Sequence, residues 1–195
     1  MKPLPTTTRG RRTRVAILGS AAQLMHERGM AAASMDDVLL ASGAGKSQLY
    51  HYFDDRRDLC AAVLQHQFER VRAAQPSLDD PSCTDLRTWG DEVLDAFRDS
   101  GGGTCPLGAF AAQTDGDPFL RETLTALFDR WQQALSDLVR RADAAGSLRP
   151  GTDPEAAGLA LLTAHQGGTL LAHLHRSEEP LARALDDVIA RLIKP

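Results

Sequence analysis

Residues 41–64 read ASGAGKSQLYHYFDDRRDLCAAVL, and this stretch decides the fold of the N-terminal part of the chain. Residues 43–45 form a Gly-containing turn between two short segments with helical spacing of apolar residues. The earlier segment opens at Ser34 with Ser-Met-Asp-Asp, in which Asp37 can complete a capping box in place of Glu. The later segment predicts a helix over residues 46–53. Two short helices joined by such a turn predict a helix-turn-helix.

Helical spacing extends over the rest of the chain. Apolar residues recur every three or four positions, and no stretch alternates β-branched or aromatic residues with polar ones. Asp54 or Asp55 can cap a long helix that reaches about Ala74. Asp-Pro pairs at 117–118 and 153–154 mark two further helix starts. We therefore predict an all-α protein of about nine helices, with a three-helix, homeodomain-like domain followed by a helical bundle.

The charge of the chain is divided unevenly. Residues 1–57 hold nine Lys or Arg and five Asp or Glu, whereas residues 58–195 hold thirteen and twenty-one, for a net charge of −4 overall. Attraction to phosphate is local once salt screens it. We therefore predict a DNA-binding domain over residues 1–57 and a ligand-binding and dimerisation domain over residues 58–195. The first domain begins with a basic arm that contains Arg9, Arg11, Arg12 and Arg14.

The predicted helix over residues 46–53 has a polar face on its first turns. Donors there can reach the base edges and phosphates of a major groove. Leu49 and Phe53 lie four residues apart and are expected to face the core. An exposed polar helix without a partner is the alternative interpretation, but the basic arm and Arg56 favour phosphate contact. The polar residues of this face are Lys46, Ser47, Gln48, Tyr50 and His51.

Residues 41–64 resemble the helix-turn-helix core of TetR-type repressors, A-x-G-V-S-K-G-T-L-Y-x-Y-F-x-S-K-x-x-L. Residues 13–30, TRVAILGSAAQLMHERGM, resemble the first helix of that family. The resemblance implies contacts with double-stranded operator DNA, and it assigns them to Ser34, Lys46, Ser47, Gln48, Tyr50, His51, Tyr52 and Arg56. Two carboxylates, Asp54 and Asp55, depart from the family pattern and would weaken attraction to phosphate.

The C-terminal part is similar to the LmrA/YxaF-like repressors within this family. The similarity lies in CPLGAFAAQ at 105–113, FDRW at 128–131 and AHQGGTLLAH at 164–173. It implies an aromatic or drug-like inducer. Large or polar-tipped side chains on separate helices can line one cavity for such a molecule, although ordinary core packing is the alternative. The predicted ligand-binding residues are Trp89, Phe97, Phe110, Gln113, Phe128, Trp131 and His165.

The last helix has an apolar stripe that needs a covering surface. Polar residues occupy its other faces, and the preceding helix is apolar on nearly all sides. A two-fold interface between two copies would cover both helices, and the family resemblance implies the same homodimer. The predicted interface residues are Leu181, Leu185, Val188, Ile189 and Leu192.

No enzyme activity, metal site or cofactor is predicted. Cys105 and His165 lack a third group that would orient them for catalysis. Residues 156–175 carry no formal charge but contain too many polar groups for a membrane span. Three cysteines without a CxxC pair fit a reducing compartment, which predicts a cytoplasmic location. Two alternatives stay open: a regulator that senses redox state through cysteines, and a helical interaction protein that does not bind DNA.

Overall fold

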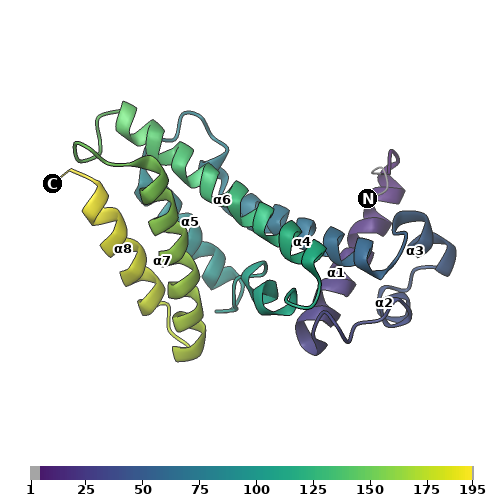
Figure 1. The fold of residues 1–195 in the computed structure, drawn as a ribbon. Helices are drawn as coiled ribbons and strands as arrows, with labels where there is room; N and C mark the ends of the chain where they lie inside the picture. Colours follow the sequence, from purple (N-terminus) through teal and green to yellow (C-terminus); the bar gives the residue numbers. More distant parts are fainter. Residues whose placement is uncertain (1–4, 195) are drawn as a thin grey trace. The chain divides into compact units, whose positions relative to one another are not determined.

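A computed structural model describes residues 5–194 of the chain. These residues form eight α-helices and two short 3₁₀ helices, η1 and η2 (Figure 1). In chain order they are α1 (Thr8–Arg28), α2 (Met35–Ser42), α3 (Lys46–Tyr52), α4 (Arg56–Ala73), η1 (Pro76–Leu78), α5 (Leu86–Asp99), η2 (Gly108–Gln113), α6 (Pro118–Ala144), α7 (Pro154–His175) and α8 (Glu179–Leu192). Within the described residues there is no β-strand, so the all-α prediction is confirmed.

The chain divides into two compact units. The first unit comprises the residues up to Glu69 together with Ala109–Thr125, and the second comprises Arg70–Gly108 and the residues from Ala126 onward. Helices α4 and α6 therefore each contribute to both units. The predicted boundary at residue 57 differs from this division and stays a prediction about function.

Local caps fix the helices of the first unit. The Ser34 hydroxyl accepts a hydrogen bond from the Asp37 backbone N–H at 3.1 Å, and the Asp37 carboxylate accepts one from the Ser34 N–H at 3.0 Å. This is the predicted capping box at the start of α2. Gly43 ends α2 in the left-handed region with φ 64°. Asp55 caps α4 by accepting from the Asp58 N–H at 2.9 Å.

The arginines of the predicted basic arm lie on the first turns of α1. Thr7 caps this helix, because its hydroxyl accepts from the Gly10 N–H at 3.1 Å. Residues 1–4 of the predicted arm lie outside the described residues. The helical arginines are Arg9, Arg11, Arg12 and Arg14.

The core of the first unit is built where the sequence predicts it. Leu49 and Phe53, on the inner side of α3 and at its end, are 0% and 1% exposed. They are buried together with Ile17 and Met25 of α1 and Val38 of α2. Burial of this face leaves the other side of α3 to solvent, which positions the candidate DNA-binding surface.

In the second unit, α7 and α8 pack side by side, and α5 packs against α8 (Figure 1). The two long helices approach closely at Gly168, where an added Cβ would lie 3.0 Å from the Leu181 Cα. The apolar stripe of α8 is therefore covered by the chain itself, with Leu181, Leu185 and Ile189 at most 3% exposed. The argument that these three residues need a partner subunit was wrong. Val188 and Leu192 are half-buried.

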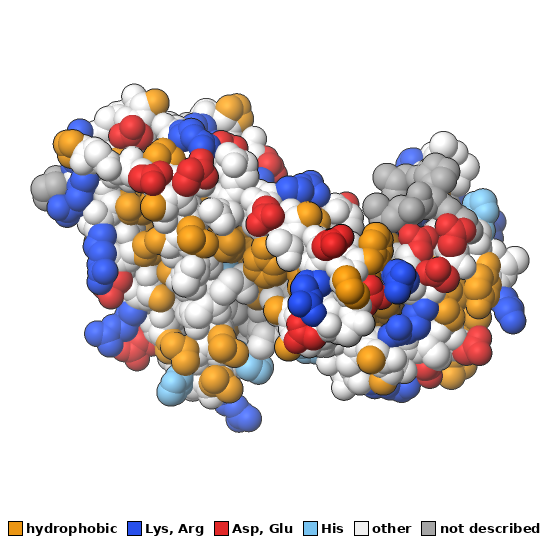
Figure 2. Space-filling view, viewed as in Figure 1, with side chains coloured by type: hydrophobic (Ala, Val, Ile, Leu, Met, Phe, Trp, Pro, Cys, Tyr) orange, Lys and Arg blue, Asp and Glu red, His pale blue; other side chains and the backbone are white. Residues whose placement is uncertain are grey.

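Helix α7 has an apolar outer side that the described chain does not cover. Four leucines there are between 48% and 67% exposed, and Figure 2 shows hydrophobic side chains at the surface over this helix. They are Leu159, Leu170, Leu171 and Leu174. Across residues 5–194, no helix is both long and apolar enough to cross a membrane.

Candidate DNA-binding surface and ligand cavity

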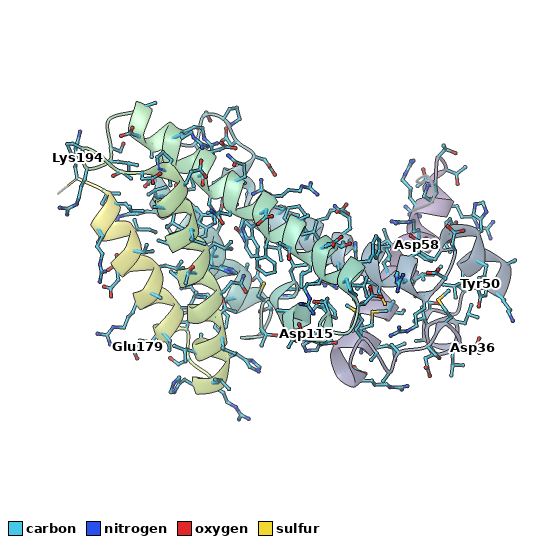
Figure 3. The ribbon with its side chains drawn as sticks, in the orientation of Figure 1. Asp36, Tyr50, Asp58, Asp115, Glu179 and Lys194 are labelled. Atoms are coloured by element: carbon cyan, nitrogen blue, oxygen red, sulfur yellow. The ribbon has the colours of Figure 1, made fainter. Side chains whose placement is uncertain are left out.

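The outer face of α3 carries the polar side chains that the sequence assigns to DNA. Lys46, Ser47, Gln48 and His51 are exposed, and Tyr50 is 41% exposed on the outer side of the helix (Figure 3). Tyr52 is half-buried, with its ring 5.1 Å from that of His51. The structure thus gathers these residues on one short helix.

Two of the predicted DNA contacts also cap helices. Ser34 is exposed, but its hydroxyl is bonded within the α2 capping box. The Gln48 amide oxygen accepts from the Gly45 N–H at 3.0 Å and so caps α3. This bond occupies the amide oxygen of Gln48, so its amide nitrogen is the group that can donate to another molecule.

Arg56 is placed differently from the prediction that it holds a phosphate. Its side chain is half-buried, and its Nε donates to the Ala33 carbonyl at 3.0 Å. A terminal nitrogen of the same guanidinium donates to the Met30 carbonyl. Arg56 therefore ties α4 to the turn between α1 and α2. A guanidinium that already donates to two backbone carbonyls contributes mainly to the stability of the fold.

Residues 109–125 dock on the same unit. The Gln113 amide oxygen accepts from the Met30 N–H at 2.6 Å, and its amide nitrogen donates to the Ala109 carbonyl at 3.0 Å. Arg57 Nε lies 2.8 Å from Asp117 Oδ2. Burial alone would raise the pKa of the Asp117 carboxyl, but the Arg57 ion pair and the hydrogen bonds from the Leu120 and Phe119 backbone N–H groups together lower it below the usual value. Gln113 thus joins η2 to the turn after α1.

The second unit contains a partly open cavity of about 280 Å³. Its wall is formed by the end of α4, the C-terminal half of α5, the loop after α5, and α7. The charged side chains among the lining residues are Arg70 and Asp99, both exposed. The apolar part of the wall includes Val71, Val93 and Phe97. The cavity is near the lower end of the size range of small-molecule sites.

Two buried tryptophans pack against His165 of the cavity wall. Trp89 and Trp131 are 0% exposed, and both indole N–H groups donate to the Gln75 amide oxygen, at 2.8 and 3.1 Å. The Trp131 ring meets the His165 ring edge-on, with 4.9 Å between centroids. Gln75 is thus a buried acceptor shared by two donors from different helices, and it also lines the cavity.

Of the seven predicted ligand-binding residues, Phe97 and His165 line this cavity. Trp89 and Trp131 pack beside His165, and Phe128 stacks near Trp131 at 6.0 Å without lining the cavity. Phe110 and Gln113 belong to the first compact unit. A role for these five in ligand binding stays a prediction. Sequence reasoning did not select Gln75 or Thr169, because neither breaks a local pattern.

The cysteines belong to no candidate metal centre in the part of the chain that the structure describes. Among the described residues, no group of three or more His, Cys, Asp or Glu side chains is placed to hold a metal ion. Cys60 and Cys105 are buried, and burial raises the pKa of both thiols. A higher thiol pKa leaves less thiolate at neutral pH, so neither cysteine is activated by its surroundings.

Comparison with known proteins identifies the family. Residues 17–63 match the model for bacterial regulatory proteins of the tetR family, and residues 85–188 match the tetracyclin repressor-like C-terminal domain. The chain is 33% identical to the uncharacterized HTH-type transcriptional regulator Rv0196 of Mycobacterium tuberculosis (strain ATCC 25618 / H37Rv) over 83% of its length and 84% of that protein. It is 24% identical to the HTH-type transcriptional repressor DhaR of Mycobacterium sp. (strain GP1), over 88% and 87%.

A solved complex of SmeT with triclosan has the same fold, with a TM-score of 0.75 at 22% identity, covering 94% of this chain and 92% of that one. The chain therefore belongs to the TetR family. Its relatives are DNA-binding transcriptional regulators, and it is a regulator rather than an enzyme. The LmrA/YxaF-like subtype is not confirmed by these comparisons.

Proposed function

We propose that this protein is a cytoplasmic repressor that binds a palindromic operator as a homodimer and releases it when a small, largely apolar or aromatic molecule fills the cavity of the second unit. The observation that carries the proposal is the exposed polar face on the first turns of α3. Burial of Leu49 and Phe53 in the core holds this face toward solvent. The repressor activity named for DhaR and the triclosan bound to SmeT support the two halves of the proposal.

Lys46, Ser47 and Gln48 are the residues proposed to read bases. They occupy the first turn of α3, and a helix that enters the major groove contacts base edges with its N-terminal residues. Tyr50 and His51 lie on the next turn and contact the groove or backbone. Ser34 and Tyr52 are proposed to hold phosphates.

Homodimerisation is proposed to use the outer side of α7 rather than the buried stripe of α8. The exposed leucines lie on this side, and an added Cβ at Gly167 would meet nothing within 4 Å, so a second helix can approach there. Half-buried Val188 and Leu192 can extend the interface. Changing Leu170 and Leu174 to Asp should give monomers in sedimentation, whereas a dimer that persists would place the interface elsewhere.

Release of DNA is proposed to run through α4. This helix carries Arg56 in the first unit and Arg70 and Val71 at the cavity wall in the second. A ligand shifts the equilibrium only if it binds the conformation that releases DNA more tightly than the one that holds it. By linkage, operator DNA must weaken ligand binding by the same factor.

The test is fluorescence anisotropy with palindromic DNA from the intergenic region beside the gene that encodes this protein. Gln48→Ala should weaken operator binding by about 1–3 kcal/mol and reduce discrimination against scrambled DNA. Gln23→Ala is the matched control, because Gln23 is exposed on α1 and bonds only locally to Glu27 at 2.9 Å. Full discrimination by Gln48→Ala would contradict the assignment of α3 as the reading helix.

The redox alternative is tested in the same assay. Hydrogen peroxide should leave operator binding unchanged, since Cys60 and Cys105 are buried and their thiol pKa values are raised. Peroxide-dependent release that is lost in Cys105→Ser or Cys60→Ser would favour the cysteine sensor over a cavity ligand.

A further inference from the structure

Two of the polar side chains that line the cavity lie on one side of α7. His165 and Thr169 are four residues apart, which places them on the same helix face one turn from each other. Both line the cavity, and they are 7% and 6% exposed. They are therefore polar side chains that are more than nine-tenths buried.

Gln166 fixes which nitrogen of His165 carries the proton. The Gln166 amide nitrogen lies 3.1 Å from His165 Nδ1 and 3.5 Å from Cys105 Sγ. The amide NH₂ group donates to both acceptors, so Nδ1 is unprotonated and the proton of the neutral ring resides on Nε2. Among the described residues, Nε2 has no hydrogen-bond partner.

Gly108 leaves room for Gln166 in this position. An added Cβ at Gly108 would lie 2.5 Å from the Gln166 amide oxygen, so a larger residue there would force the Gln166 side chain to move. The Gly108 backbone N–H donates to Cys105 Sγ at 3.3 Å. Cys105 Sγ, in the loop after α5, thus accepts from both Gly108 and Gln166, the neighbour of His165 on α7.

Thr169 differs from Thr163 and Thr123, two other threonines in the helices. Thr163 and Thr123 each donate their hydroxyl to the carbonyl four residues earlier, at 2.8 Å. The Thr169 hydroxyl is buried without any hydrogen-bond partner. A buried hydroxyl without this hydrogen bond destabilises the folded state unless another group bonds to it.

The buried polar side chains of the wall, which are Gln75, Cys105, His165 and Thr169, include no charged group. Burial lowers the pKa of His165 to about 4, so its ring is neutral at pH 7. The charged lining residues, Arg70 and Asp99, are exposed and of opposite sign. A buried carboxylate or ammonium of the ligand would therefore lose its hydration without gaining an ion pair.

We propose that the ligand of this cavity carries an uncharged hydrogen-bond acceptor, such as the carbonyl of a ketone, ester or amide, which accepts from His165 Nε2–H and from the Thr169 hydroxyl. Its apolar body packs against Val71, Val93 and Phe97. This inference rests on the proposed function, because it takes the cavity to be the inducer site. It adds the polar group that an inducer must present.

The test uses matched probes on benzene and naphthalene rings: methyl ketones, isopropyl compounds of the same shape without an acceptor, and carboxylates. Binding to the full-length protein is measured by calorimetry at pH 7. The ketones should bind about tenfold more tightly than the isopropyl compounds, which is the effect of one to two net hydrogen bonds. The carboxylates should bind more weakly than the ketones.

His165→Phe and Thr169→Val should each remove most of the preference for ketone over isopropyl compound, while Thr163→Val, the matched control, should keep it. Equal binding of ketone and isopropyl probes by the wild type, tighter binding of the carboxylates, or no binding of any probe would overturn the inference. Operator release is measured separately. Ketone binding without release would contradict the proposed function but leave this inference standing.

Discussion

The reading helix and the cavity use glutamine side chains in opposite ways. Gln48 bonds to a backbone N–H three residues away and stays exposed. Gln75 is 2% exposed and accepts from two indoles that are 14 and 56 residues away in the sequence. The comparison shows that the DNA-binding surface is specified by local sequence, whereas the cavity is specified by packing between distant segments.

The first prediction compares the two glutamines directly. Gln75→Leu leaves two buried indole N–H groups without an acceptor, so the free energy of unfolding should fall by about 3 kcal/mol. Gln48→Leu should cost less than about 1 kcal/mol, since its partner can bond to water instead. Urea denaturation measures both. Similar losses for the two variants would remove the distinction between local and long-range specification.

The second prediction concerns pH. The folded pKa of His165 is lowered to about 4 by burial, from a usual value of 6.5. Because the unfolded chain binds the proton more readily, stability is full above pH 6.5 and falls as the pH drops toward 4, by at most about 3 kcal/mol. His165→Phe should lose this pH-dependent contribution. His51→Gln, on the exposed face of α3, should keep the wild-type profile, and a flat wild-type profile would contradict the burial of a neutral His165.

Features that depend on a few neighbouring residues could be predicted from the sequence, whereas features that depend on distant segments could not. The capping box at Ser34, the end of α2 at Gly43 and the Asp117-Pro118 helix start were predicted because each pattern spans only a few residues. The cover of the α8 stripe was predicted wrongly, because periodicity identifies an apolar face but not the surface that buries it. Thr169 escaped selection for the same reason: its unbonded hydroxyl is a property of the fold.

The third prediction separates a structural cation from a DNA-binding one. Arg56→Ala should lower the free energy of unfolding by about 2 kcal/mol, because the Ala33 and Met30 carbonyls lose a charged donor. The dependence of operator affinity on salt should stay as in the wild type. Lys46→Ala should reduce that slope by about 0.9 with little effect on stability. A flatter slope at unchanged stability in Arg56→Ala would restore Arg56 as a phosphate contact.

Met30 has an unusual position in the hydrogen-bond network, because its carbonyl accepts from Arg56 and its N–H donates to the Gln113 side chain. The chain contains four methionines, so labelling with ¹⁵N-methionine yields a sparse amide spectrum. The Met30 signal then reports whether η2 is docked on the turn after α1. The Met30 amide should exchange with solvent deuterium faster if a ligand detaches η2 from this turn. A single amide signal would then report the detachment in the absence of DNA.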